Sequence, residues 1–202
     1  ADTLCKIFSE IKSLNPNILQ GQDDYFFTTR LEFDKDWGMG SSSTLISLLA
    51  QWAGVDPYEL LRRTMGGSGY DIACATASKP LTYRLADSKP LVEEVDFNPS
   101  FAQNLYFVYQ GHKQNSGKEV KSFKERTQKE KFSDEIHEIS EISDALIKTD
   151  SFDVFCALLT RHETIMSHCL EQLPLKASFP DFQGTVKSLG AWGGDFFLAS
   201  SD

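Results

Sequence analysis

The sequence predicts an α+β fold in two domains. The prediction rests on helix patterns, on strand patterns and on one change in composition along the chain. Apolar residues at helical spacing occur in both halves, and short β-branched and aromatic segments lie between them. At residues 96–100 the turn cluster DFNPS precedes a half that is richer in charge and helix. The 202 residues suffice for two small domains, so we expect one over residues 1–96 and another over 97–202.

In the first half, residues 4–14 show an amphipathic helix pattern, and YFFTTRLEF at 25–33 predicts a strand. The serine-rich segment at 41–44 leads into a buried helix. DPYELLRRT at 56–64 has an N-cap Asp and a Pro at the first helical position, which predicts a short helix. GGSGYDIACATAS at 66–78 is a glycine-rich turn that enters a helix of small residues.

Strands and longer helices account for the rest of the chain. Segments with strand character lie at 80–85, 91–97 and 104–110. Helical stretches follow at 118–132, 133–147 and 151–173, and the first two are charged on one face. A glycine-rich turn and a buried strand at 195–200 close the sequence.

The composition indicates a globular protein and argues against several partners. Apolar residues make up 41% of the chain and aromatic residues 12%, more than a disordered chain contains. The net charge of −9 argues against a nucleic-acid surface, and no apolar stretch is long enough to span a bilayer. With no secretory signal, the scattered cysteines predict reduced, buried thiols in a cytoplasmic protein. They are Cys5, Cys74, Cys156 and Cys169.

The segment WGMGSSSTLISLLAQW at 37–52 places two glycines and four hydroxyl residues before a run of apolar helix formers. Gly38 and Gly40 can adopt backbone angles that are closed to other residues. Serine and threonine are good N-caps but mediocre in helix interiors. The pattern predicts a buried helix with a bare, hydroxyl-rich N-terminus. Such an N-terminus collects unpaired N–H groups and a partial positive charge, so it suits a phosphate group.

Three glycine-rich segments carry a resemblance to a known family. Residues 38–43 read Gly-Met-Gly-Ser-Ser-Ser, residues 68–73 read Ser-Gly-Tyr-Asp-Ile-Ala, and residues 190–194 read Gly-Ala-Trp-Gly-Gly. In order and spacing they resemble the motifs of the GHMP kinases, the superfamily of galactokinase, homoserine kinase, mevalonate kinase and phosphomevalonate kinase. The run at 69–73 also spells the signature of the bacterial GYDIA-type subfamily. The resemblance extends from about residue 4 to residue 200.

This resemblance implies an ATP- and Mg²⁺-dependent enzyme that transfers the γ-phosphoryl group to the hydroxyl of a small molecule, such as a mevalonate-like alcohol. It implies a partial nucleotide-binding N-terminal domain and a partial ferredoxin-like C-terminal domain. Asp71 would accept a hydrogen bond from the substrate alcohol and act as the catalytic base. The implied nucleotide-binding residues are Gly38, Gly40, Ser41, Ser42, Ser43, Gly190, Gly193 and Gly194.

Further residues follow from the same resemblance. The turn at Ser68 and Gly69 and the stretch with Lys113 and Ser116 would contact the substrate. The hydroxyl of Ser42 or Ser43, with Glu59 as a second candidate ligand, would help to hold Mg²⁺.

Several of these residues also have a simpler structural interpretation. Ser41, Asp71 and Ser116 could each be a plain helix cap. Glu59 could be a solvated side chain, and the glycines at 193–194 could form an ordinary tight turn.

The chain departs from the family pattern at both ends. No first motif of the family precedes residue 38, and the strand and helix that follow the third motif are absent. These departures predict a fragment, whose own turnover is in question. Two other functions stay open, an ATP-dependent decarboxylase of the same fold and a non-catalytic nucleotide or metabolite sensor. The expected partner is a small-molecule alcohol rather than a nucleic acid or a membrane, and a homodimer is compatible with the sequence.

Overall fold

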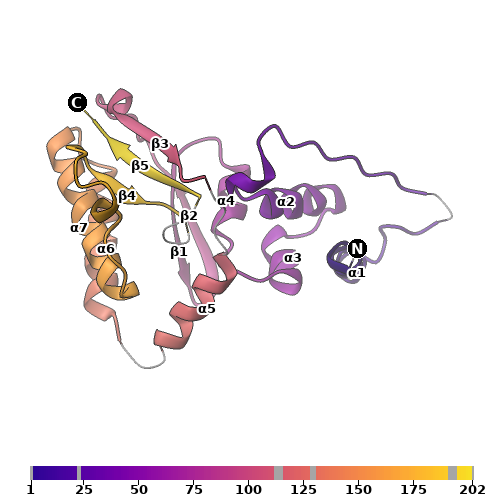
Figure 1. Ribbon diagram of the computed structural model, residues 1–202. Helices are drawn as coiled ribbons and strands as arrows, with labels where there is room; N and C mark the ends of the chain where they lie inside the picture. The colour runs from indigo at the N-terminus through magenta and orange to yellow at the C-terminus, as the bar shows by residue number, and fades with distance from the viewer. Residues whose placement is uncertain (1, 22–23, 112–115, 128–130, 191–194, 202) are drawn as a thin grey trace. The chain divides into compact units, whose positions relative to one another are not determined.

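The computed structural model describes residues 2–21, 24–111, 116–127, 131–190 and 195–201. The chain divides into two compact units (Figure 1). Unit 1 comprises residues 1–35 and 39–96, and unit 2 comprises residues 36–38 and 97–202. Helices combine with small antiparallel sheets, which confirms the mixed α and β class.

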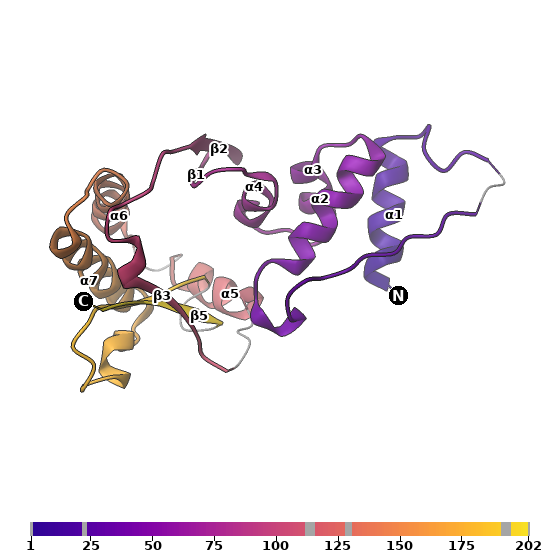
Figure 2. The ribbon, with the colours of Figure 1, turned by 90° about the horizontal axis from the view of Figure 1, so that it is seen from above.

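Unit 1 packs its helices around one apolar core. Its elements are α1 (Asp2–Leu14), α2 (Ser41–Ala53), α3 (Pro57–Thr64), α4 (Tyr70–Thr76), β1 (Leu81–Ala86) and β2 (Lys89–Glu94). Helices α1, α2 and α3 lie side by side (Figure 2). Ile7, Ile46 and Leu60, one from each, are fully buried in the shared core. The apolar residues of each helix recur at helical spacing, so they form one apolar face, and this face packs against the other two helices.

Local sequence signals set the ends of the smaller elements. The Asp56 carboxylate accepts a hydrogen bond of 2.8 Å from the backbone N–H of Tyr58, so it caps α3 as the sequence predicts. Strands β1 and β2 form an antiparallel hairpin. Asp87 and Ser88 join them with φ of 51° and 62°, the left-handed backbone that a two-residue hairpin turn favours.

The predicted strand at 25–33 is not formed. Residues 24–31 have no regular structure, and no strand pairs with them among the described residues. Tyr25 and Phe27 instead pack against Trp52 of α2, with ring centroids 6.0 and 4.7 Å away. The aromatic content that predicted the strand thus serves packing against a helix, because strand formation also needs a neighbouring strand.

In its described residues, unit 2 combines a three-stranded antiparallel sheet with three α-helices. Its elements are β3 (Leu105–Tyr109), α5 (Ser116–Thr127), α6 (Ser133–Leu146), α7 (Phe152–Leu170), β4 (Val186–Ser188) and β5 (Phe196–Ser200). The short 3-10 helix η2 (Ala102–Asn104) precedes β3, and η3 (Leu175–Ser178) lies between α7 and β4, whereas η1 (Lys35–Trp37) lies between α1 and α2 in the chain. The strand order is β3-β5-β4. Strand β4 is only three residues long, which is too short for the sequence pattern to predict it.

Both faces of the central strand β5 are covered. Leu198 packs against Phe155 and Leu159 of α7. The preceding residue, Phe197, points to the opposite face and packs with Val186 beneath the segment that follows η3. This alternation buries β5, as predicted for the last strand.

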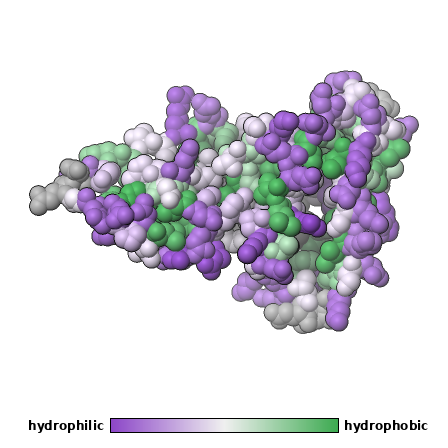
Figure 3. Space-filling view, turned by 180° about the vertical axis from the view of Figure 1, so that it is seen from behind, coloured by the Kyte–Doolittle hydropathy of each residue, from purple (hydrophilic) through white to green (hydrophobic). Residues whose placement is uncertain are grey.

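Apolar side chains also reach the surface among hydrophilic ones (Figure 3). Phe26 of unit 1 is 97% exposed, and Phe107 on the edge strand β3 of unit 2 is 73% exposed. Within the part of the chain that is described, no helix has both the length and the apolar character needed to cross a bilayer.

Candidate active site

The serine-rich helix α2 begins behind a glycine that supplies no side-chain cap. Gly40 is the N-cap residue, with φ of 70°, and its carbonyl accepts the N–H of Thr44 at 2.9 Å. Ser41 is the first residue inside the helix, so the alternative that Ser41 caps it is wrong. The N–H groups of the first turn have no acceptor within the helix, which leaves them available to an anion.

Asp71 lies beside this glycine. A Cβ placed on Gly40 would lie 3.6 Å from both Cβ and Cγ of Asp71. Asp71 is the second residue of α4, whose N-cap is Gly69, so it does not cap that helix. Its carboxylate makes no hydrogen bond or ion pair within the described residues. Asp71 is exposed by its accessible surface, but the protein atoms around its carboxylate desolvate it in part and raise its pKa above the ordinary value, which favours proton acceptance.

Gly40 and Asp71 line one small pocket. Its volume is about 130 Å³, and its walls are Met39, Gly40, Thr44, Asp71, Cys74 and Ala75. This volume suits a group the size of a phosphoryl group, whereas a whole nucleotide needs more space. Thr44 and Cys74 were not among the predicted site residues. The sequence could have indicated both residues, because side chains three or four positions apart lie on the same face of a helix. Thr44 follows Gly40 by four positions, and Cys74 follows Asp71 by three.

The turn before Asp71 is tightly packed. Gly69 has φ of 86°, and a Cβ there would approach a ring carbon of Tyr58 to 2.8 Å. The hydroxyl of Tyr83 on β1 donates to the carbonyl of Ser68, and the Ser68 hydroxyl accepts the N–H of Tyr70 at 3.3 Å. Glycine is therefore required at position 69 for both backbone angle and space.

Ser68 and Gly69, the predicted substrate contacts, line a second and larger cavity of unit 1. Its volume is about 510 Å³, and Arg62 and Lys89 contribute cationic side chains to its wall. Asp71 does not line this cavity, so the predicted base and the predicted substrate turn border two different pockets.

Glu59 faces this larger cavity and is held by two arginines. Its Oε2 lies 2.6 Å from Nη2 of Arg62, and its Oε1 lies 2.6 Å from Nε of Arg63. These hydrogen bonds, Arg62 first, hold the pKa of Glu59 below its ordinary value. Both carboxylate oxygens are thus engaged, which fits an ion pair on α3 better than a metal ligand. The described residues contain no group of three acidic, histidine or cysteine side chains that could bind a metal ion.

In unit 2, Gly38 packs against Asp195, which follows the third glycine-rich segment in the chain. Gly38 has φ of 68°, and a Cβ there would overlap the carboxylate of Asp195. Gly190, just after β4, has φ of 62°, and no atom of the described residues lies within 4 Å of a Cβ placed on it. Gly38 and Asp195 are thus in contact within unit 2.

Several predicted residues cannot be placed. Lys113, Gly193 and Gly194 lie outside the described residues. Ser116 is the first residue of α5, and its side chain also lies outside the description.

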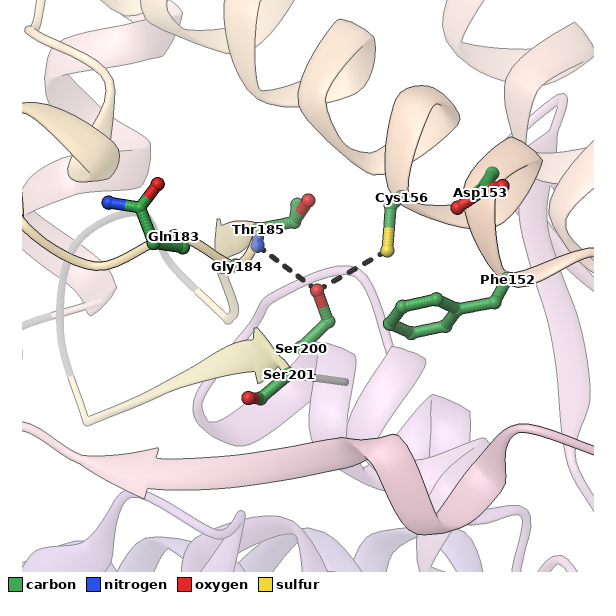
Figure 4. A pocket seen from close by; sticks show the side chains of 8 residues that line it. All are labelled: Phe152, Asp153, Cys156, Gln183, Gly184, Thr185, Ser200 and Ser201. Carbon is green, nitrogen blue, oxygen red and sulfur yellow. Dashed lines mark hydrogen bonds between the residues drawn. The ribbon is translucent and has the colours of Figure 1, made fainter.

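A further cavity of unit 2 contains none of the predicted site residues (Figure 4). Its volume is about 310 Å³, and its walls are Phe152, Asp153, Cys156, Gln183, Gly184, Thr185, Ser200 and Ser201. The Ser200 hydroxyl accepts the N–H of Thr185 at 3.0 Å and lies 3.3 Å from Sγ of Cys156. The lining has a carboxylate but no cationic side chain, so it is unsuited to phosphate.

Comparison of the chain with protein-family models, with curated proteins and with solved structures gives no significant match in any of the three. Membership of the GHMP kinases therefore stays a prediction that rests on the motifs.

Proposed function

We propose that this protein binds the phosphates of ATP at the N-terminus of α2 and transfers the γ-phosphoryl group to a small-molecule alcohol. The observation that carries the proposal is the juxtaposition of Gly40 and Asp71 in one pocket. An uncapped helix N-terminus favours a phosphate, and an unpaired carboxylate beside it can accept a proton. In this proposal the two units correspond to the N-terminal and C-terminal domains of a GHMP-type kinase.

Each participant has a defined task in the transfer. The alcohol oxygen forms a bond to the γ-phosphorus, the bond from that phosphorus to the β,γ-bridging oxygen breaks, and ADP leaves. Asp71 receives the proton of the alcohol. The backbone N–H groups of residues 41–43 stabilise the charge on the phosphates. Mg²⁺, when bound with the nucleotide, neutralises further phosphate charge, and the hydroxyls of Ser42 and Ser43 are its candidate protein ligands.

The test is ATP binding by calorimetry and ADP release against a panel of small alcohols, on the full-length protein. Gly40→Val should weaken ATP binding about tenfold or more, because hydrogen bonds to a charged group contribute roughly 1.5–3 kcal/mol. Gly54→Val is the matched control, because Gly54 has φ of 62° at the other end of the same helix.

The outcomes separate the alternatives. Equal ATP affinity in the two glycine variants would remove the phosphate site from α2. Binding without turnover by the full-length protein would favour a sensor, and release of CO₂ with the phosphate would favour a decarboxylase.

A further inference from the structure

Residues 24–31 of unit 1 form an extended segment that has no neighbouring strand. Figure 1 shows this segment as a run without helical turns, which follows α1 and precedes α2 in the chain. No backbone N–H or C=O group of residues 24–31 forms a hydrogen bond within the described residues. An unpaired extended backbone of this kind is a template for a strand of another chain.

The side chains of this segment already alternate as they do in a strand. Tyr25 and Phe27 pack against Trp52 of α2, with ring centroids 6.0 and 4.7 Å from that of the indole. Phe26 lies between them in the chain and is 97% exposed, so its ring points away from α2. Successive side chains of a strand point to opposite faces. The segment therefore has the side-chain arrangement of a strand and lacks a strand to pair with.

The outward face of the segment carries one carboxylate and one guanidinium group. By the same alternation, this face consists of Asp24, Phe26, Thr28 and Arg30. All four residues are exposed. Neither Asp24 nor Arg30 forms an ion pair within the described residues. The two charges thus stand at opposite ends of one exposed face, and each has room for a partner.

Two copies of this face are complementary when the segments run antiparallel about Phe27. A two-fold axis at that residue places Asp24 of each copy opposite Arg30 of the other, and Phe26 of each copy opposite Thr28 of the other. Opposite charges and aromatic–β-branched pairs at facing positions stabilise antiparallel strands. Arg30 also lies diagonal to Phe26 of the second copy, within reach of a cation–π contact.

The charges favour this register over its neighbours. Pairing about Thr28 would place Asp24 opposite Glu32, and pairing about Arg30 would place two guanidinium groups opposite each other. Like charges at facing positions are destabilising. Pairing about Phe27 avoids both conflicts, and it keeps the inward side chains on the face that packs against α2.

We propose that residues 24–30 are a self-association surface, through which two copies of this chain pair as antiparallel strands. The occupant of the open strand edge is the same segment of a second copy. A two-fold dimer of this kind is closed, because each copy uses its edge once. The proposal does not depend on the proposed nucleotide chemistry, since the pairing uses none of the residues assigned to it.

The first test is sedimentation velocity of the full-length protein over a wide range of concentrations, where a monomer–dimer equilibrium is expected. Arg30→Glu faces Asp24 of the second copy with a like charge at both ends of the interface, so the dissociation constant should rise about tenfold to a hundredfold. The double variant Asp24→Arg/Arg30→Glu exchanges the two charges and should restore the dimer. Arg84→Glu alters an exposed arginine on β1, so it is the matched control and should leave the equilibrium unchanged.

Disulfide trapping tests the register. The background has serine in place of the exposed Cys5 and Cys74. Phe26→Cys and Thr28→Cys chains face each other only in a mixed dimer, where their Cα atoms would lie about 4.5–5.5 Å apart, close enough for a disulfide. In either variant alone the two equivalent positions are displaced by two residues, which is too far to bridge. A linked dimer should therefore form in the mixture and not in either variant alone.

Several results would overturn the proposal. One is a full-length protein that stays monomeric at every concentration, and another is an Arg30→Glu variant that associates as the unmodified protein does. Equal weakening by Arg84→Glu would also overturn it, because the dimer would then respond to net charge rather than to a facing pair. A linked dimer in Thr28→Cys alone would overturn the register about Phe27.

Discussion

Asp71 of unit 1 and Glu163 of unit 2 are both carboxylates, yet they occupy opposite electrostatic situations. Asp71 has no hydrogen-bond partner within the described residues, and partial desolvation raises its pKa. Glu163 accepts three hydrogen bonds and an ammonium contact, which together lower its pKa. Asp71 is therefore available to a ligand, whereas the hydrogen bonds of Glu163 are used within the fold.

The largest expected effect is on turnover at Asp71. Asp71→Asn keeps the shape of the side chain and removes the proton acceptor, so kcat should fall about 10²- to 10⁴-fold with little change in ATP affinity. Because Asp71 caps no helix, the thermal midpoint should stay within about a degree or two. Single-turnover rate and thermal melting of the same full-length variant give both values. A fall in stability with the rate per folded molecule intact would make Asp71 structural.

The second effect is on stability at Glu163. Glu163→Gln leaves the Lys187 ammonium buried and unpaired, which should cost roughly 3–5 kcal/mol of unfolding free energy. Glu138→Gln, at the exposed pair with Arg161, should cost far less, because solvent screens surface ion pairs. Urea unfolding followed by amide exchange of α7 measures both. Equal losses would show that burial does not distinguish the two glutamates.

The third effect is a pH dependence from His162. Its pKa is lowered from 6.5 to about 4, so between these pH values the unfolded chain binds more protons than the folded one. Stability should therefore fall as the pH falls through this window, by about 2–3 kcal/mol in total. His162→Leu should flatten the dependence, whereas His168→Gln, at an exposed position, should leave it in place. Urea denaturation at a series of pH values measures this pH dependence. If the free energy of unfolding of His162→Leu changes with pH as steeply as that of the unmodified protein, another group takes up the proton.

The smallest effect is expected at Asp56, the carboxylate whose role is only local. Asp56→Ala removes the cap of α3 and should cost about 1 kcal/mol of stability. ATP affinity and turnover per folded molecule should be unchanged, because Asp56 borders only the larger cavity of unit 1 and not the pocket of Gly40 and Asp71. Melting and turnover measured together check this. A loss of turnover larger than the loss of folded protein would place Asp56 in the site.

The sequence predicted local features well and tertiary ones poorly. The cap at Asp56, the start of α2 and the burial of β5 follow from residue type and spacing, and the structure has them. The strand predicted at 25–33 is wrong, because aromatic content shows burial but not what a segment packs against. Nothing in the sequence distinguishes Glu163 from its exposed neighbours, because its burial depends on β4, which was itself not predicted.

The proximity of Gly40 and Asp71 could be predicted only in part from the sequence. The motifs named both residues, but their separation in the chain gives no distance, and only the packing of α4 beside α2 brings them together. The glycines at 193–194 and Lys113 stay predictions, since they lie outside the described residues.

The aromatic clusters provide each unit with its own optical reporter. Trp52 of unit 1 packs among the rings of Phe8, Tyr25 and Phe27. In unit 2, the ring centroids of Trp37 and Phe196 lie 6.0 Å apart. With Trp192 and one of these two replaced by phenylalanine, the indole that remains would emit from a single unit. Emission spectra during denaturation would then show whether the two units unfold in one transition or two.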